Sequence, residues 1–378
     1  MTVFRTHDTR RRVRSRVRLA IAAAAAIGLA TVAGQRSTGA QQSTPARPGV
    51  AAAGPAAGIR AIPVRGNVYM LTGAGANVAV SVGKDGLVVV DSGSADKSAA
   101  LLAALQALSR SVTSRTMPEP SCVGVVSGCP WWNSSQFLPI TAAPPAPRPI
   151  IGIINTSSDA DRIGGNARLS TAGKSFGVRN AANVTNAWIV AHENVASAMS
   201  KLTPAPDGDA MPSESYFGTD KKLNYINGEA VILSYRPAAH SNGDSMVHFR
   251  ASDVLVTGEI MDMTSYPVID VAHGGTIDGM VDALNWILDV AVVEHMMEGG
   301  TLIIPGHGRL SDAADVAYYR DMMTIFRDRI RELSKRGMTL AQIQATKPTR
   351  DYDPRFGRNP AWTPAQLVEA MYKTIKKS

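Results

Sequence analysis

Two acidic side chains follow an apolar run in a pattern that could bind a cation. The run 150–154 predicts a buried strand, and it stops at small and acidic residues that include Asp159 and Asp161. Because these carboxylates are two residues apart, they would point the same way in an extended loop and could share a metal ion. The alternative is a strand-to-helix turn in which an aspartate caps the helix, and the local pattern alone favours that interpretation.

Short strands and a helix precede this run and must position it. Residues 59–93 alternate between apolar stretches and glycine turns, a pattern typical of antiparallel hairpins. Residues 98–108 predict an amphipathic helix, because their apolar residues recur three or four positions apart. Two further helices, over about 311–335 and 363–377, are expected at the periphery of the fold.

The positive charge of the chain is concentrated at its N-terminus. The 378 residues carry a net charge of +8, and 45% of them are hydrophobic, which is ample for a core. Residues 1–40 hold eight arginines against the single acid Asp8, so the remaining residues contribute only about +1. So small a charge would attract a phosphate backbone only weakly. The sequence therefore argues against nucleic acid as a partner.

The same N-terminal block has the features of an export signal. Arginines precede an apolar run from Leu19 to Gly34, and small residues follow up to Ala40. The run is shorter than a membrane-spanning helix requires, so we expect no membrane span after cleavage of 1–40. The stretch Thr9–Val13 resembles a twin-arginine signal, although a general secretory signal fits as well. Either route predicts a periplasmic or secreted protein, whose residues 41–58 form a linker.

The two cysteines fit an exported protein. Cys122 and Cys129 lie seven residues apart without a nearby histidine, a poor spacing for zinc and a good one for a small disulfide loop. They belong to the long segment 109–149, which also contains Trp131 and Trp132. We interpret this insertion either as an ordered flap over a site or as a surface feature.

The strand end at 150–166 resembles the signature of the metallo-β-lactamase superfamily. That signature reads Thr-His-x-His-x-Asp-His followed by Gly-Gly. Thr156, Asp161 and the glycine pair match it. Ser157, Asp159 and Arg162 stand where the family usually has its three histidines. The match therefore comes with an altered set of ligands.

Four other strand ends carry the resemblance further. Asp91 matches an aspartate that supports the metal-binding loops in the family, although it could instead cap the following helix. His240 falls on a ligand histidine, and Asp244 on a residue that shapes its loop. Glu259 replaces an aspartate that bridges two metals in many members, and His307 belongs to the family's Ile-Pro-Gly-His-Gly motif. The resemblance covers about 59–335 and implies an α/β fold, a four-layer αββα sandwich, followed by a helical extension over 336–378.

The resemblance implies a metal site of unusual composition. The positions of metal ligands are occupied by Asp159, Asp161, His240, Glu259 and His307. Side chains expected to support them without binding the metal are Asp91, Ser157, Arg162 and Asp244. Serine is a poor zinc ligand, so this set suits one divalent ion and conceivably two, with zinc expected first and manganese or iron as alternatives. Two other histidines have different expected roles. His192 is expected to be structural or to cap a helix, and His273 either supplies a missing nitrogen ligand from a neighbouring loop or lines the mouth of the site.

These observations predict an exported metal-dependent hydrolase of small molecules. Metal-bound hydroxide would attack an ester, lactone, thioester or amide, with Asp161 orienting the water or taking its proton. The alternative is a pseudoenzyme without metal, acting as a periplasmic binding or scaffold module. In that case Arg162 would replace the metal by an ion pair with Asp159 or Asp161.

Overall fold

The structure is a computed structural model, and it describes residues 58–116, 146–174, 186–293 and 299–375. The predicted export signal at 1–40, most of the linker and most of the insertion lie outside the described residues. So do Cys122 and Cys129, and the disulfide stays a prediction. Among the residues that are described, no helix is both long and apolar enough to cross a membrane.

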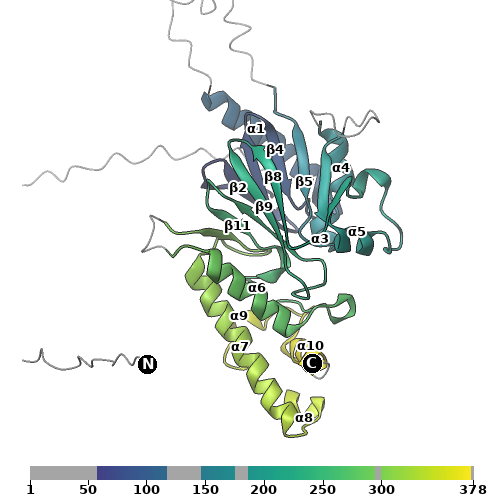
Figure 1. Cartoon of the computed structure of the whole chain (residues 1–378), viewed down its shortest axis with the longest axis vertical. Helices are drawn as coiled ribbons and strands as arrows, with labels where there is room; N and C mark the ends of the chain where they lie inside the picture. Colours follow the sequence, from purple (N-terminus) through teal and green to yellow (C-terminus); the bar gives the residue numbers. More distant parts are fainter. Residues whose placement is uncertain (1–57, 117–145, 175–185, 294–298, 376–378) are drawn as a thin grey trace, which may run out of the picture. The chain divides into compact units, whose positions relative to one another are not determined.

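The first sheet contains seven strands in the order in which they occur in the chain (Figure 1). Its strands are β1 (Arg60–Arg65), β2 (Val68–Ala74), β3 (Ala76–Gly83), β4 (Gly86–Val90), β5 (Ile150–Ile154), β6 (Trp188–His192) and β7 (Glu214–Tyr216). Strands β1 to β4 pair antiparallel, which confirms the hairpins predicted for 59–93. Strands β4 to β7 pair parallel, so their carboxyl ends lie along one edge of the sheet.

The second sheet contains five strands in the order β12-β11-β10-β9-β8. Its strands are β8 (Asp220–Ile226), β9 (Glu229–Tyr235), β10 (Ser245–Phe249), β11 (Val254–Val256) and β12 (Leu302–Ile304). All neighbours pair antiparallel except β11 and β12, which are parallel. The carboxyl ends of β11 and β12 therefore lie at the same edge of this sheet.

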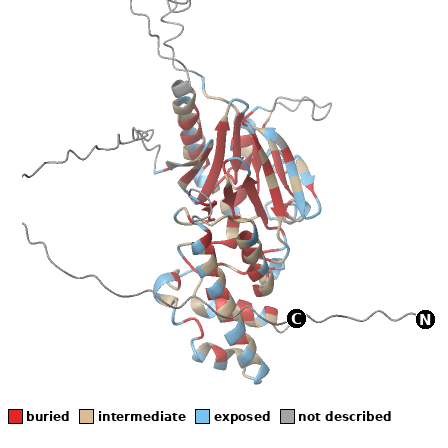
Figure 2. Ribbon diagram, turned by 60° about the vertical axis from the view of Figure 1, so that its left-hand side comes forward, coloured by how far each residue is buried: buried red, intermediate tan, exposed pale blue. Residues whose placement is uncertain are grey.

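Three apolar cores show that the two sheets face each other with helices outside. Alternate side chains point to opposite faces of a strand, and in β11 Val254 and Val256 pack between the sheets while Leu255 packs on the outer face. The core between the sheets also contains Val88, Val90 and other side chains of the first sheet. Figure 2 shows the resulting buried strands in red.

Helices cover both outer faces and complete the four layers. The helices α1 (Ser98–Thr116) and α4 (Asn166–Ala172) pack on the first sheet. The helices α6 (Ile277–Val290), α7 (Ala313–Lys335) and α10 (Pro364–Ile375) share a core with the second sheet. The remaining helices are α3 (Ala160–Ile163), α5 (Glu193–Met199), α8 (Leu340–Ala345) and α9 (Asp353–Phe356).

Three predicted helices differ from those in the structure: the helix over 98–108 differs in length, and those over about 311–335 and 363–377, present as α7 and α10, are more buried than expected. The helix predicted over 98–108 continues to Thr116, beyond the last residue of its clear apolar pattern. The helix predicted over about 311–335 is present as α7, but it is not peripheral. Its side chains Tyr319, Met322 and Phe326 are fully buried in the core that includes α6 and α10. The sequence pattern predicted the amphipathic face of α7, but it did not predict that α6 and α10 cover that face.

Candidate metal centre

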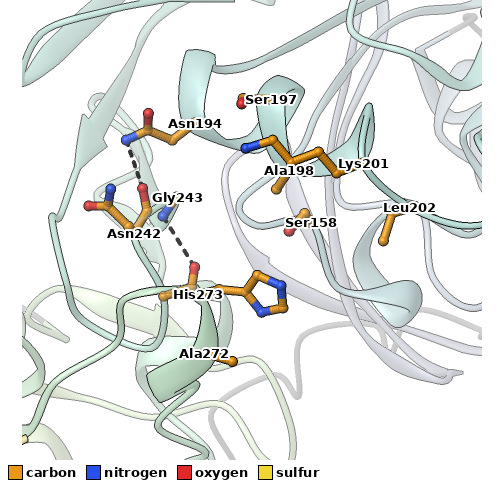
Figure 3. Close-up of a pocket in the computed structure, with 11 residues that line it drawn as sticks. Ser158, Asn194, Ser197, Ala198, Lys201, Leu202, Asn242, Gly243, Ala272 and His273 are labelled. Carbon is orange, nitrogen blue, oxygen red and sulfur yellow. Dashed lines mark hydrogen bonds between the residues drawn. The ribbon is translucent and has the colours of Figure 1, made fainter.

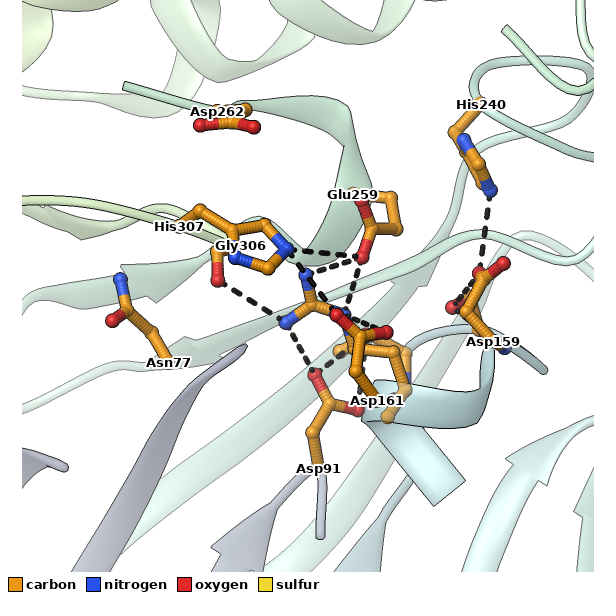
Figure 4. A network of polar contacts seen from close by, with 12 residues as sticks. Asn77, Asp91, Asp159, Asp161, His240, Glu259, Asp262, Gly306 and His307 are labelled. Carbon is orange, nitrogen blue, oxygen red and sulfur yellow. Dashed lines mark hydrogen bonds and ion pairs between the residues drawn. The ribbon is translucent and has the colours of Figure 1, made fainter. Parts of the chain in front are cut away.

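The polar residues that follow five strands meet at one edge of the two sheets (Figure 4). Asp91 follows β4, and the segment 156–162 follows β5. His240 lies in the loop between β9 and β10, Glu259 follows β11, and His307 follows β12. Because β5 belongs to the first sheet and β9 to β12 belong to the second, the site is built from both layers.

Three of the five predicted ligands form a group that could hold one metal ion. Ligand atoms of Asp161, Glu259 and His307 all lie within 4.8 Å of one another. His307 Nε2 is 3.3 Å from Asp161 Oδ2 and 3.8 Å from Glu259 Oε1. Ligand atoms around a four-coordinate zinc ion are about 3.4 Å apart, since each lies about 2.1 Å from the ion. The spacing and the donor types of these three residues therefore fit one divalent ion.

The other two predicted ligands form a separate pair. His240 Nε2 lies 3.2 Å from Asp159 Oδ2, and Ser157 Oγ donates a hydrogen bond of 2.5 Å to the same oxygen. The ring is fixed from its other side, where Nδ1 lies 2.9 Å from the carbonyl oxygen of Val268 and must donate to it. Asp159 occupies the N-cap position of α3 but makes no capping hydrogen bond, because its carboxylate faces His240 instead.

Arg162 is the cation at the centre of the site. Its side chain is fully buried, and its Nε and Nη2 both contact Glu259 Oε1, the former at 2.7 Å. Its Nη1 lies 3.6 Å from Asp91 Oδ2, and its Nε lies 3.9 Å from Asp161 Oδ1. The sequence predicted a pairing with Asp159 or Asp161. In the structure, Glu259 is the main partner of Arg162 and Asp161 is a more distant one. Asp159 takes part in none of these ion pairs.

Backbone geometry makes room for this guanidinium. A Cβ atom on Gly306 would lie 2.5 Å from Arg162 Nη2 and 2.5 Å from the carbonyl oxygen of Gly258. Only a glycine therefore fits before His307 without displacing its neighbours. The turn is held by Asn77, whose Nδ2 donates to the carbonyl oxygens of Pro305 and Gly308 at 2.9 and 3.0 Å. Asn77 is therefore a structural residue of the site that was not predicted from the sequence.

Asp91 and Asp244 are buried and hold loops of the site in place through hydrogen bonds. Asp91 accepts hydrogen bonds from Thr156 N at 2.8 Å and from Thr156 Oγ1, and it is not the cap of the following helix, whose N-cap is Ser94. Asp244 accepts a hydrogen bond of 2.6 Å from Ser241 N and fixes the loop that carries His240. Burial raises the pKa of both carboxyl groups to about 7, despite the nearby cations.

The acidic and basic groups of the site shift each other's pKa. Burial would lower the pKa of both histidines, but the hydrogen bond with Asp159 raises that of His240 to about 10. Contacts with Asp161 and Glu259 raise the pKa of His307 to about 9. Burial opposes ionisation of Glu259, yet Arg162 and His307 hold the pKa of that carboxyl well below its usual range. Without a metal ion, these groups therefore form ion pairs.

Two histidines outside the centre have the positions that were predicted for them. His192 is the N-cap of α5, where its Nδ1 accepts a hydrogen bond of 3.3 Å from Asn194 N. His273 lines a pocket beside the site, and its Nδ1 lies 2.5 Å from Asp270 Oδ2. It is not a member of the group that could hold a metal ion.

Comparison with solved structures confirms the fold. Over 83% of its length the chain superposes on a double mutant of the sec-alkyl sulfatase PisA1, with 15% sequence identity and a TM-score of 0.53. The stereoselective inverting sec-alkylsulfatase Pisa1 from Pseudomonas sp. gives the same coverage and identity with a TM-score of 0.51. A metallo-β-lactamase from Pontibacter korlensis matches 70% of the chain and 99% of its own, with 13% identity and a TM-score of 0.46.

The chain therefore has the metallo-β-lactamase fold, a four-layer αββα sandwich, as predicted. It spans about half the length of the sulfatase chains, since the match covers 49% of each. No protein-family model matches the sequence, and no curated protein is significantly similar to it. At these identities the comparison shows the fold, and the function must be argued from the site.

Proposed function

We propose that this protein is a hydrolase that depends on one divalent metal ion held by Asp161, Glu259 and His307. The observation that carries the proposal is the convergence of these three ligand groups, within 4.8 Å of one another, at the carboxyl ends of strands from both sheets. Two carboxylates and one imidazole suit zinc, manganese or iron. Asp159 and His240 are outside this group because they pair with each other.

The residues around the ion would have different roles in hydrolysis. A divalent ion bound there would lower the pKa of a coordinated water and polarise a carbonyl group. Asp161 is partly exposed and adjacent to His307, so it can orient the attacking water and accept its proton. His240 can hold a proton at Nε2 beside Asp159, which keeps that carboxylate ionised. This arrangement supports attack on an ester, lactone, thioester or amide of a small molecule.

The proposal includes export. It rests on the arginine-rich and apolar segments within residues 1–40, together with two cysteines that suit an oxidising compartment. Fractionation of cells that express the full chain tests it directly. The expected result is a periplasmic or secreted product that is shorter than the precursor by about 40 residues, and a full-length cytoplasmic product would contradict export.

A second candidate function follows from the burial of Arg162. The guanidinium contacts Glu259 with two nitrogens and lies near Asp91 and Asp161, so it already neutralises part of the acidic group. A site closed in this way would serve a binding or scaffold module that needs no metal.

Metal content separates the two candidates. The full chain is purified without chelator, incubated with zinc, manganese or iron, and analysed by native mass spectrometry together with Asp161→Ala and His307→Ala. His273→Ala is the matched control, because it removes a histidine that is near the site but outside the ligand group. We expect one equivalent of metal in the wild type and in the control, and less than a tenth as much in the two ligand variants. Absence of metal from every sample would favour the binding module.

A further inference from the structure

A pocket lies beside the candidate metal centre. It has a volume of about 340 Å³, which is the size of a site for a small organic molecule. It lies among α5, the loop after His240 and the turn at His273 (Figure 3).

The pocket borders two segments that carry candidate catalytic residues. Ser158 lies between Ser157 and Asp159, and Ser241 directly follows His240. The pocket therefore lies next to the segments that carry Asp159 and His240.

The charge of the lining favours an anion. None of the described residues that line the pocket is acidic, whereas Lys201 carries a positive charge. Figure 3 shows the Lys201 side chain extending into the pocket toward Asn194 and Asn242. The Asp270 carboxylate lies outside the lining, and it fixes the orientation of the His273 ring.

Hydrogen bonds hold the polar side of the pocket in place. Asn194 Nδ2 donates hydrogen bonds of 2.8 Å to the carbonyl oxygen of Asn242 and of 3.0 Å to Tyr235 Oη. The backbone of Asn242 donates to the carbonyl oxygen of His273 at 2.9 Å, so the two loops hold each other. Apolar surface from Ala198, Leu202 and Ala272 completes the wall and suits a short hydrocarbon stem.

We propose that this pocket binds the anionic group of a small organic acid whose scissile bond faces the metal centre, with Lys201 as the main cationic contact. This inference rests on the proposed function only for the position of the scissile bond. The substrate class is then an ester, lactone, thioester or amide that retains a carboxylate or another anionic group on a short apolar stem.

The test measures binding to protein treated with chelator, so coordination of the anion to a metal ion cannot contribute. Hexanoate, its neutral analogue hexanamide and the headgroup alone, acetate, are titrated separately into the full chain, and backbone amide shifts locate each probe. We expect hexanoate to bind more tightly than either other probe and to shift the amides of residues 198–202 and 241–243. Equal binding of hexanamide would overturn the inference, and so would hexanoate shifts confined to other residues.

Variants at one position identify the contact. Lys201→Met should weaken hexanoate binding by about fivefold, whereas Lys201→Arg should retain most of it because the charge is preserved. Lys222→Met is the matched control, since Lys222 is exposed on β8 and lies outside the pocket. Unchanged hexanoate binding in Lys201→Met would contradict the inference. Failure of metal uptake with intact hexanoate binding would contradict only the hydrolase proposal.

Discussion

Arg162 and Glu259 are 97 residues apart in the sequence and form the closest cation–carboxylate contact of the site, with Nε 2.7 Å from Oε1. Arg162 follows a strand of the first sheet, and Glu259 follows a strand of the second. The same carboxylate oxygen lies 3.8 Å from His307 Nε2, and Glu259 belongs to the candidate ligand group. A metal ion bound there would therefore share the Glu259 carboxylate with a buried arginine.

Loss of the buried cation should destabilise the protein when no metal is present. Arg162→Met leaves Asp91 and Glu259 without their cationic partner, and breaking a buried ion pair costs about 3–5 kcal/mol. Urea denaturation in the presence of chelator measures this change in the free energy of unfolding. The double variant Arg162→Met with Asp91→Asn should recover part of the loss, because it removes one of the unpaired charges.

Arg168→Met is the control for that experiment. Arg168 is on α4, where its Nε donates to Ser98 Oγ, and it makes no contact with the site. We expect a loss of less than about 1 kcal/mol from this variant. Equal losses in Arg168→Met and Arg162→Met would contradict a special role for the buried pair.

Replacing the arginine by histidine should tighten metal binding. Arg162→His removes a positive charge beside Glu259 and adds an imidazole nitrogen near Asp161, so the repulsion of a divalent ion falls and the number of donors rises. We expect zinc affinity to increase about tenfold or more, measured by competition with a chromogenic chelator. Arg162→Lys keeps the charge and should bind zinc no more tightly than the wild type. A folded histidine variant with unchanged affinity would show that Arg162 does not limit metal binding.

The fit of Arg162 against the turn at Gly306 gives a test of the packing. Gly306→Ala places a methyl group 2.5 Å from both Arg162 Nη2 and the carbonyl oxygen of Gly258, so the backbone must move. We expect a cost of about 1–3 kcal/mol, typical of overpacking in a rigid site. Gly208→Ala is the matched control, because its Cβ would have no atom within 4 Å. If both variants unfold at the same urea concentration, the close approach described for Gly306 is wrong.

The raised histidine pKa values predict a loss of stability at high pH in protein treated with chelator. His240 and His307 have pKa values of about 10 and about 9 in the folded protein, against about 6.5 for an unfolded histidine. Their contribution is fully present below pH 6.5 and disappears as the pH rises through 9 and 10. Urea midpoints measured between pH 6 and pH 10 should therefore fall more steeply in the wild type than in His240→Gln. Parallel curves for the two proteins would rule out the contribution of His240.

The sequence was sufficient for the fold because each strand end carries local information. Apolar runs such as 150–154 and 301–304 predict buried strands, and the polar clusters after them occur in the order of the metallo-β-lactamase fold. The resemblance to the metallo-β-lactamase superfamily placed Asp161, Glu259 and His307 at one site, and the structure brings them together. The capping role of His192 could also be predicted, since it directly precedes a helix.

The pairing of charges within the site could not be predicted. Asp159 is closer in sequence to Arg162 than to His240, yet it faces His240, because α3 directs the Arg162 side chain beneath the site toward Glu259. The separation of the ligands into a pair and a group of three depends on side-chain directions in loops, which have no periodic pattern. The pocket around Lys201 was missed for a similar reason, since its lining comes from three segments that share no motif.

The origin of the three candidate ligands from two layers has a consequence for ligand screening. Asp161 follows β5 of the first sheet, whereas Glu259 and His307 follow β11 and β12 of the second. An ion or inhibitor that binds all three can do so only while the two sheets are packed together, so it binds the native state and not the unfolded chain. Mass action then raises the melting temperature of the whole sandwich by an amount that grows with ligand concentration. A thermal-shift assay on the intact protein can therefore rank metals and substrate analogues before any catalytic reaction is known.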